Sequence, residues 1–160
     1  MRVGLGMLVF ALLAACSPTP PPPNLGAEGL PVMGNQAFAE KLGFTPCFHT
    51  SNALRCRKEG VRLFGKGPFR GAVDMKEGKG SGFYELTLWS DGDQDAVLEV
   101  NPVLKANGWT LCRTGQEDRG DQEIWTKPGA KVRFSTDISY WGKRRLRILP
   151  EYGQPVGHCF

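Results

Sequence analysis

Few residues suited to metal binding or nucleophilic catalysis are present in this chain of 160 residues. It contains only two histidines, His49 and His158, and no two cysteines stand in Cys-x-x-Cys spacing. That spacing is typical of zinc sites and thiol redox centres, and histidine is the usual general base. The Gly-x-Ser-x-Gly elbow of many hydrolases is also missing. We therefore expect no metal, no cofactor and no catalytic residues.

One acidic cluster has the wrong neighbours for a calcium loop. Asp91, Asp93 and Asp95 match the first ligands of an EF-hand, but Ala96 and Pro102 stand where that loop needs Gly and Glu. Acidic residues are also favourable at the start of a helix. The sequence therefore indicates no calcium site here.

Long hydrophobic runs are equally scarce. Residues 3–15 are apolar or glycine and follow Arg2, and no later stretch approaches 18 apolar residues. A basic start and a short apolar run are typical of an export signal, whereas a membrane-spanning helix needs about 20 apolar residues. The first 15 residues are thus predicted to be a signal peptide.

The apolar run ends in Leu13-Ala14-Ala15-Cys16, which resembles the lipobox of bacterial lipoproteins. The resemblance implies cleavage before Cys16, lipidation of its thiol and acylation of the new amino terminus. Several acyl chains hold a protein at a bilayer far better than one. We expect a domain facing the periplasm or exterior, lipid-anchored in a bacterial envelope. The resemblance also implies that Ser17, the residue after the cysteine, favours the outer membrane where the organism has one.

Residues 16–34 read as a tether between the lipid and a single domain at residues 35–160. Four consecutive prolines, Pro20–Pro23, favour an extended conformation of about 3.1 Å per residue. Glycines and a further proline follow, and these residues are typical of loops. The predicted role of the segment is that of a spacer.

The cysteines fit an exported protein. Four remain after Cys16, and an even number in an exported chain predicts two disulfides. A two-residue turn at Ser51-Asn52 would place Cys47 directly opposite Cys56. The predicted pairs are therefore Cys47–Cys56 and Cys112–Cys159.

Two segments of the chain resemble each other. Residues 35–47 and 101–112 each begin with an asparagine suited to a helix start, continue to a glycine and then show an aromatic residue, Thr and Cys. Fainter similarities link 57–64 with 126–134 and 85–88 with 145–148. We therefore expect an α+β fold with a tandem repeat, in which a short helix and an antiparallel meander of about four strands occur in residues 35–90 and again in 91–160.

Alternating apolar residues give the expected strands. They lie at 44–49, 53–58, 61–66, 82–89, 109–115, 121–127, 131–137 and 144–149. This tandem plan is similar in architecture to the β-lactamase inhibitor proteins of bacteria. The resemblance rests on no motif, so it implies no binding residues.

Positive charge is concentrated near the C-terminus. Residues 127–147 carry seven Lys or Arg side chains and a single acidic one, Asp137. The predicted contacts with an anionic surface are Lys131, Arg133, Trp141, Lys143, Arg144, Arg145 and Arg147. Such a strip can face lipid headgroups, an acidic protein or an anionic envelope polymer, or it can simply be a solvated face.

The register of the predicted C-terminal hairpin follows from charge. Phe134 and Ile148 must share the buried face, which requires an odd number of loop residues. A five-residue loop at 139–143 sets Asp137 opposite Arg145, whereas a three-residue loop would oppose two arginines. Opposite charges across a strand pair are favourable and like charges are not, so we predict the longer loop.

These features favour a lipid-anchored envelope protein with a non-catalytic binding domain for a protein or an anionic envelope component. Two alternatives are an exported hydrolase with an unrecognised site and an inhibitor module directed at an exported enzyme. Nucleic acid is not an expected partner, because the leader directs the chain out of the cytoplasm.

The lipid anchor predicts the behaviour of one variant. Cys16→Ser removes the thiol that would carry the lipid, so the protein should move from the membrane fraction to the soluble fraction. Fractionation and immunoblotting measure this, with Ser17→Ala as the control that stays bound. A Cys16→Ser protein that remains fully membrane-bound would contradict the lipobox interpretation.

Overall fold

In a computed structural model, the structure describes residues 28–76, 83–115, 122–138, 144–151 and 158–159. The elements, in chain order, are α1 (Gln36–Lys41), β1 (Cys47–His49), β2 (Ala53–Leu63), β3 (Lys66–Lys76), β4 (Phe83–Trp89), the 3-10 helix η1 (Ala96–Glu99), α2 (Val100–Ala106), β5 (Thr110–Arg113), β6 (Gln122–Thr126), β7 (Val132–Asp137), β8 (Leu146–Pro150) and β9 (His158–Cys159).

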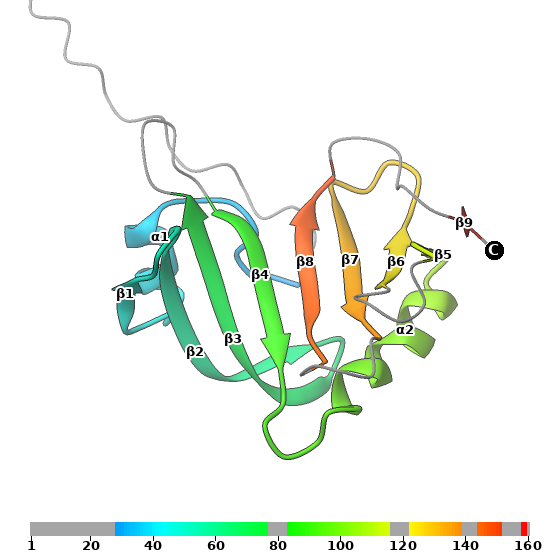
Figure 1. The fold of residues 1–160 in the computed structure, drawn as a ribbon, viewed down its shortest axis with the longest axis horizontal. Coiled ribbons are helices and arrows are strands. Elements are labelled where there is room, and N and C mark those ends of the chain that lie inside the picture. Colours follow the sequence, from blue (N-terminus) through cyan, green and yellow to red (C-terminus); the bar gives the residue numbers. More distant parts are fainter. Residues whose placement is uncertain (1–27, 77–82, 116–121, 139–143, 152–157, 160) are drawn as a thin grey trace, which may run out of the picture.

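The described strands form one antiparallel sheet. Their order is β1-β2-β3-β4-β8-β7-β6-β5-β9, so β1 to β4 and β5 to β8 are two meanders that meet where β4 pairs with β8 (Figure 1). Figure 1 also shows α1 beside β1 and β2, and α2 near β5 and β6. Neither described α-helix is long and apolar enough to cross a membrane.

The expected α+β tandem repeat is wrong. The two described α-helices have only six and seven residues, and the strands of both halves join into a single sheet instead of two helix-and-meander units. The physical reason is that β4 and β8 are both alternating strands with a free edge, and each satisfies the backbone groups of the other. The fold is therefore β-rich.

The first meander also differs from the prediction. The expected strand at 61–66 does not exist as a separate element, because β2 continues to Leu63 and turns at Phe64 and Gly65 into the unpredicted strand β3. Both turn residues have positive φ, at 51° and 72°, as a tight two-residue hairpin turn requires. A register shift between Lys58 and Val61 interrupts the alternation of β2, which is why its length was not visible in the sequence.

Because of that register shift, the sequence similarity between residues 57–64 and 126–134 does not correspond to a structural similarity. Gly60 lies inside β2, whereas Gly129 lies in the turn between β6 and β7. The two glycines therefore occupy different structural positions.

Both helices end ahead of the predicted glycines, Gly43 and Gly108, but only the first begins as predicted. The Asn35 side chain accepts a hydrogen bond from the Phe38 amide at 3.0 Å, and Gly43 follows α1 with φ of 83°. Asn101 lies inside α2 rather than before it, and η1 runs directly into α2. Pro102 fits there because the first-turn amides of a helix need no intrahelical acceptor.

The core lies between the helices and one face of the sheet. A single row of core side chains crosses six strands through successive pairs in the register, and each is at most 4% exposed. This row is Cys56, Val73, Leu86, Ile148, Phe134 and Trp125. Ala39 of α1 and Leu104 of α2 belong to the same cluster. Val32 is also fully buried in it, so packing begins ahead of residue 35.

The pairing of the cysteines was predicted from the sequence and can be compared with the structure. A disulfide joins Cys47 to Cys56, which are directly opposite in the β1–β2 register. Cys112 is also disulfide-bonded, and the backbone register places Cys159 opposite it. The first predicted disulfide is confirmed, and the backbone positions are those that the second requires.

The predicted register of the C-terminal hairpin is confirmed as well. Phe134 is opposite Ile148 and Ser135 is opposite Arg147, and the Asp137 amide donates to the Arg145 carbonyl at 3.0 Å. The predicted loop at 139–143 lies outside the described residues.

The β4–β8 junction can be tested by cross-linking. Thr87 and Arg147 are directly opposite, and opposed Cα atoms of antiparallel strands lie about 4.5–5.5 Å apart, within the range of a disulfide. The Thr87→Cys, Arg147→Cys pair should therefore cross-link under mild oxidation, as peptide mapping will show. The control pair Thr87→Cys, Ser135→Cys spans two strand spacings, about 10 Å, and should not. Efficient cross-linking of the control alone would contradict the strand order.

Candidate functional site

The face of the sheet opposite the core carries a second row of side chains. Each member is adjacent in sequence to a core residue, so it points the other way. The register joins this row across the same six strands. It consists of Arg57, Ala72, Thr87, Arg147, Ser135 and Ile124. Ala72 and Thr87 are small, which leaves a depression in the middle of this face.

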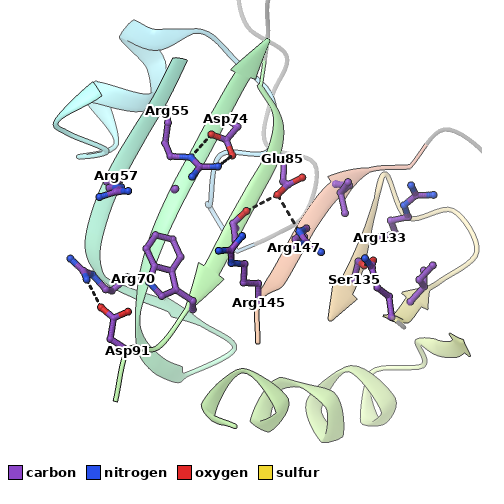
Figure 2. A pocket seen from close by; sticks show the side chains of 16 residues that line it. Arg55, Arg57, Arg70, Asp74, Glu85, Asp91, Arg133, Ser135, Arg145 and Arg147 are labelled. Atoms are coloured by element: carbon purple, nitrogen blue, oxygen red, sulfur yellow. Dashed lines mark hydrogen bonds and ion pairs between the residues drawn. The ribbon is translucent and has the colours of Figure 1, made fainter. Parts of the chain in front are cut away.

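A groove with a cavity volume of about 730 Å³ lies over this row. Arginine dominates its described lining, and Figure 2 shows these side chains rising from β2, β3, β7 and β8. The six arginines are Arg55, Arg57, Arg70, Arg133, Arg145 and Arg147. Three carboxylates of the described residues accompany them: Asp74, Glu85 and Asp91. The described lining therefore carries a net positive charge.

Local sequence explains the position of four of these arginines. Cys56 of β2 and Leu146 of β8 are fully buried in the core. Each stands between two arginines, as Arg55-Cys56-Arg57 and Arg145-Leu146-Arg147. Because side chains alternate along a strand, burial of the middle residue directs both neighbours to the opposite face.

One ion pair fixes the β2 end of the groove. Arg55 and Asp74 are opposite in the β2–β3 register, and the guanidinium donates two hydrogen bonds to the carboxylate at 2.6 and 2.7 Å. The Asp74 side chain is only 4% exposed, whereas that of Arg55 is 35% exposed. Two-point pairs of this kind hold arginine in one orientation.

Two further arginines are held by carboxylates. Arg147 lies 3.4 Å from Glu85, which also accepts a hydrogen bond from the Thr87 hydroxyl at 2.7 Å. Arg70 pairs with Glu59 at 2.7 Å and with Asp91. The hydrogen bonds to Glu59 and Asp91 raise the pKa of Arg70 above its usual value, so this side chain remains charged.

Arg57 and Arg145 differ from the others. Both are exposed, and neither has an ion pair with a carboxylate of the described residues. The Arg57 guanidinium lies over the ring of Phe48, 4.7 Å from its centroid, a stacking contact that leaves its hydrogen-bond donors available. Arg133 has a distant partner, Glu151, at 4.0 Å. Among the described groove residues, positive charge without an ion pair therefore lies on β2, at Arg57, and just ahead of β8, at Arg145.

The groove gathers some of the sequence-predicted residues and excludes others. Arg133, Arg145 and Arg147 line it. Lys131 is exposed outside the lining. Arg144 pairs with Asp95, and its amide donates to Gln94 at 2.9 Å. Cys16, Trp141 and Lys143 lie outside the described residues.

Sequence reasoning missed Arg55, Arg57 and Arg70. The Arg-Cys-Arg pattern of β2 was a usable signal, since it matches the Arg-Leu-Arg pattern of β8. Arg70 belongs to a strand that was not predicted.

The acidic residues of the suspected calcium loop have other contacts. Asp91 pairs with Arg70 and Asp95 with Arg144, while Asp93 accepts a hydrogen bond from the Asp95 amide at 2.9 Å. Among the described residues, no three histidine, cysteine or acidic side chains are grouped as metal ligands.

Comparisons with protein-family models, curated proteins and solved structures find no match for this chain. What the site can do therefore follows from its chemistry. Planar guanidinium groups bind carboxylates and phosphates through paired hydrogen bonds. The arrangement is suited to holding an anion.

The Arg55–Asp74 pair predicts an unequal effect of two substitutions. Arg55→Met leaves a buried carboxylate without a partner, whereas Asp74→Asn leaves a guanidinium that water partly reaches. We expect Arg55→Met to lower the free energy of unfolding by about 2–4 kcal/mol and Asp74→Asn by about 1 kcal/mol. Urea denaturation measures both values. Equal losses, or a larger loss for Asp74→Asn, would contradict this asymmetry.

Proposed function

We propose that this protein is a lipid-anchored component of a bacterial envelope whose domain binds an anionic ligand in the arginine groove. The observation that carries the proposal is the presence of six arginines in one groove. Two of them, Arg57 and Arg145, are exposed and have no ion pair with a described carboxylate. Concentrated positive charge in a hollow raises the local concentration of anions and speeds their association.

The carboxylates in the groove support this interpretation. Asp74, Glu85 and Asp91 each contact an arginine, so they hold guanidinium groups in place before any ligand arrives. Side chains that are already ordered lose less conformational entropy on binding. The paired arginines thus shape the groove, and the exposed ones offer hydrogen-bond donors.

Binding is favoured over catalysis by the same contacts. The three carboxylates are engaged with arginines, and the described lining includes neither histidine nor cysteine. A general base must have a proton-accepting group directed at the substrate. We therefore propose a ligand that is held and not transformed.

The leader sequence supports the location. The lipobox-like Leu13-Ala14-Ala15-Cys16 and the proline-rich segment after it indicate a domain tethered by lipid to a membrane. A tethered domain meets the anionic polymers and proteins of the envelope at high effective concentration.

The proposal is tested with dextran sulfate, a generic polyanion, and the full-length lipidated protein in a neutral detergent. Calorimetry should show binding that weakens steadily with added salt, because exposed charges are screened. The Arg57→Gln, Arg145→Gln double variant should bind at least about tenfold more weakly, since each charged hydrogen bond contributes about 1.5–3 kcal/mol.

A matched control removes the same charge from the helices. Lys41 and Lys105 are exposed on α1 and α2 and do not line the groove. The Lys41→Gln, Lys105→Gln double variant should bind as the unmodified protein does. Equal weakening by the two double variants would show that net charge, and not the groove, attracts the polyanion.

A further inference from the structure

Provided that the groove is the binding site proposed above, the positions of its charges indicate which chemical class of ligand it binds. We propose that the ligand is an acidic oligosaccharide, a hydroxyl-rich chain bearing carboxylates, that crosses the sheet from β2 to β8. Arginines that have no ion pair with a described carboxylate mark its two ends, and a mostly neutral polar surface lies between them.

The two ends are set by Arg57 and Arg145. Arg57 is on β2 and Arg145 directly precedes β8, with β3 and β4 between. Three strand spacings separate β2 from β8 by about 14 Å, and Arg145 is displaced further along the strand because the register joins Arg57 to Arg147. Because the Arg57 guanidinium lies over Phe48 of β1, on the side of β2 away from β8, a single phosphate or carboxylate contacts one end only. A ligand that satisfies both arginines carries at least two anionic groups joined by a spacer.

The middle of the groove is suited to a neutral spacer. Its carboxylates, Glu85 and Asp91, are paired with arginines, and they repel a chain that is anionic at every unit. Carboxylate oxygens accept hydrogen bonds from hydroxyl groups at the lone pairs left free by one arginine contact. A chain with many hydroxyl groups between its charges therefore fits better than polyphosphate.

An aromatic side chain in the same region adds a second argument. Trp89 of β4 lines the groove, is half-buried and stands opposite Arg70 in the β3–β4 register. Its strand lies between β2 and β8. An indole ring contributes apolar area for the face of a sugar ring while its polar neighbours bind the hydroxyls. The groove thus combines stacking, hydroxyl acceptors and two anion-binding ends.

An acidic peptide is less favourable on this surface. Extended peptides are commonly bound by adding a strand to an exposed sheet edge, where main-chain groups are available. Here β3, β4 and β8 are interior strands paired on both sides, so ligand recognition relies on side chains. Sugars are recognised in that way, because their donors and acceptors radiate from a compact ring.

The experiment compares four probes by calorimetry with the full-length lipidated protein in neutral detergent. The probes are glucuronic acid, a hyaluronan oligosaccharide of four to six units, in which acidic and neutral sugars alternate, the methyl ester of that oligosaccharide, and polyglutamate of matched charge. The hyaluronan oligosaccharide should bind at least about tenfold more tightly than each of the other three, because only it combines carboxylates separated by neutral sugars with hydroxyl-rich rings.

Single substitutions test the two ends and the aromatic middle of the groove separately. Arg57→Gln and Arg145→Gln should each weaken binding of the hyaluronan oligosaccharide at least about tenfold. At least one of the two substitutions should leave the binding of glucuronic acid unchanged, because a single carboxylate occupies only one end. Trp89→Leu should weaken binding of the oligosaccharide but not binding of polyglutamate. Trp89→Phe should keep most of the affinity for the oligosaccharide. Lys105→Gln is the charge-matched control and should change nothing.

Each remaining outcome overturns the inference in a distinguishable way. If polyglutamate binds as tightly as the hyaluronan oligosaccharide, the ligand is an acidic peptide or protein and only the proposed function stands. If vesicles of anionic phospholipid compete best, the groove faces a membrane. If neither these probes nor dextran sulfate binds, the proposed function fails together with the ligand class.

Discussion

The pairing of β4 with β8 is the constraint on which the rest of the molecule depends. Only three residue pairs define it in the register, Leu86 with Ile148, Thr87 with Arg147 and Leu88 with Leu146. Through them the two meanders form one sheet, and the core row runs without interruption from β2 to β6. The same three pairs bring the arginines of β2 and β3 onto the face that carries those of β7 and β8.

The two faces of the sheet follow from alternation alone, but they are stabilised differently. On the helix side, Leu86, Leu88 and Leu146 are fully buried in one hydrophobic cluster. On the open side, close cross-strand ion pairs such as Arg55–Asp74 keep like charges apart and in fixed positions. An excess of arginine over carboxylate remains, and it is costly unless a ligand or solvent neutralises it. The proposed binding of anions rests on that excess.

Local features were predictable from the sequence because they rest on neighbouring residues. The turn at Ser51-Asn52 determines the Cys47–Cys56 pair, and the alternation around Phe134 and Ile148 determines the β7–β8 register. Both hairpins were correctly registered. The capping of α1 by Asn35 is equally local.

The α+β expectation failed, and half of the groove was missed, for reasons that short motifs cannot reveal. The register shift after Lys58 concealed the length of β2, so β3 and Arg70 were not predicted. The edge at which β4 meets β8 depends on long-range packing, and no turn between the two strands specifies it. Arg57 and Arg145 therefore looked unrelated in the sequence, although both line one groove.

The most direct test of the central claim is the response of individual arginines to a bound anion. Side-chain Nε–H signals of ¹⁵N-labelled protein can be followed by NMR during titration with short dextran sulfate fragments, with assignment by Arg→Gln variants. The account predicts that the signals of Arg57 and Arg145 shift together and saturably, while that of Arg113, which pairs with Glu123 outside the groove, stays in place. Shifts at Arg113 without shifts at Arg57 and Arg145 would contradict it.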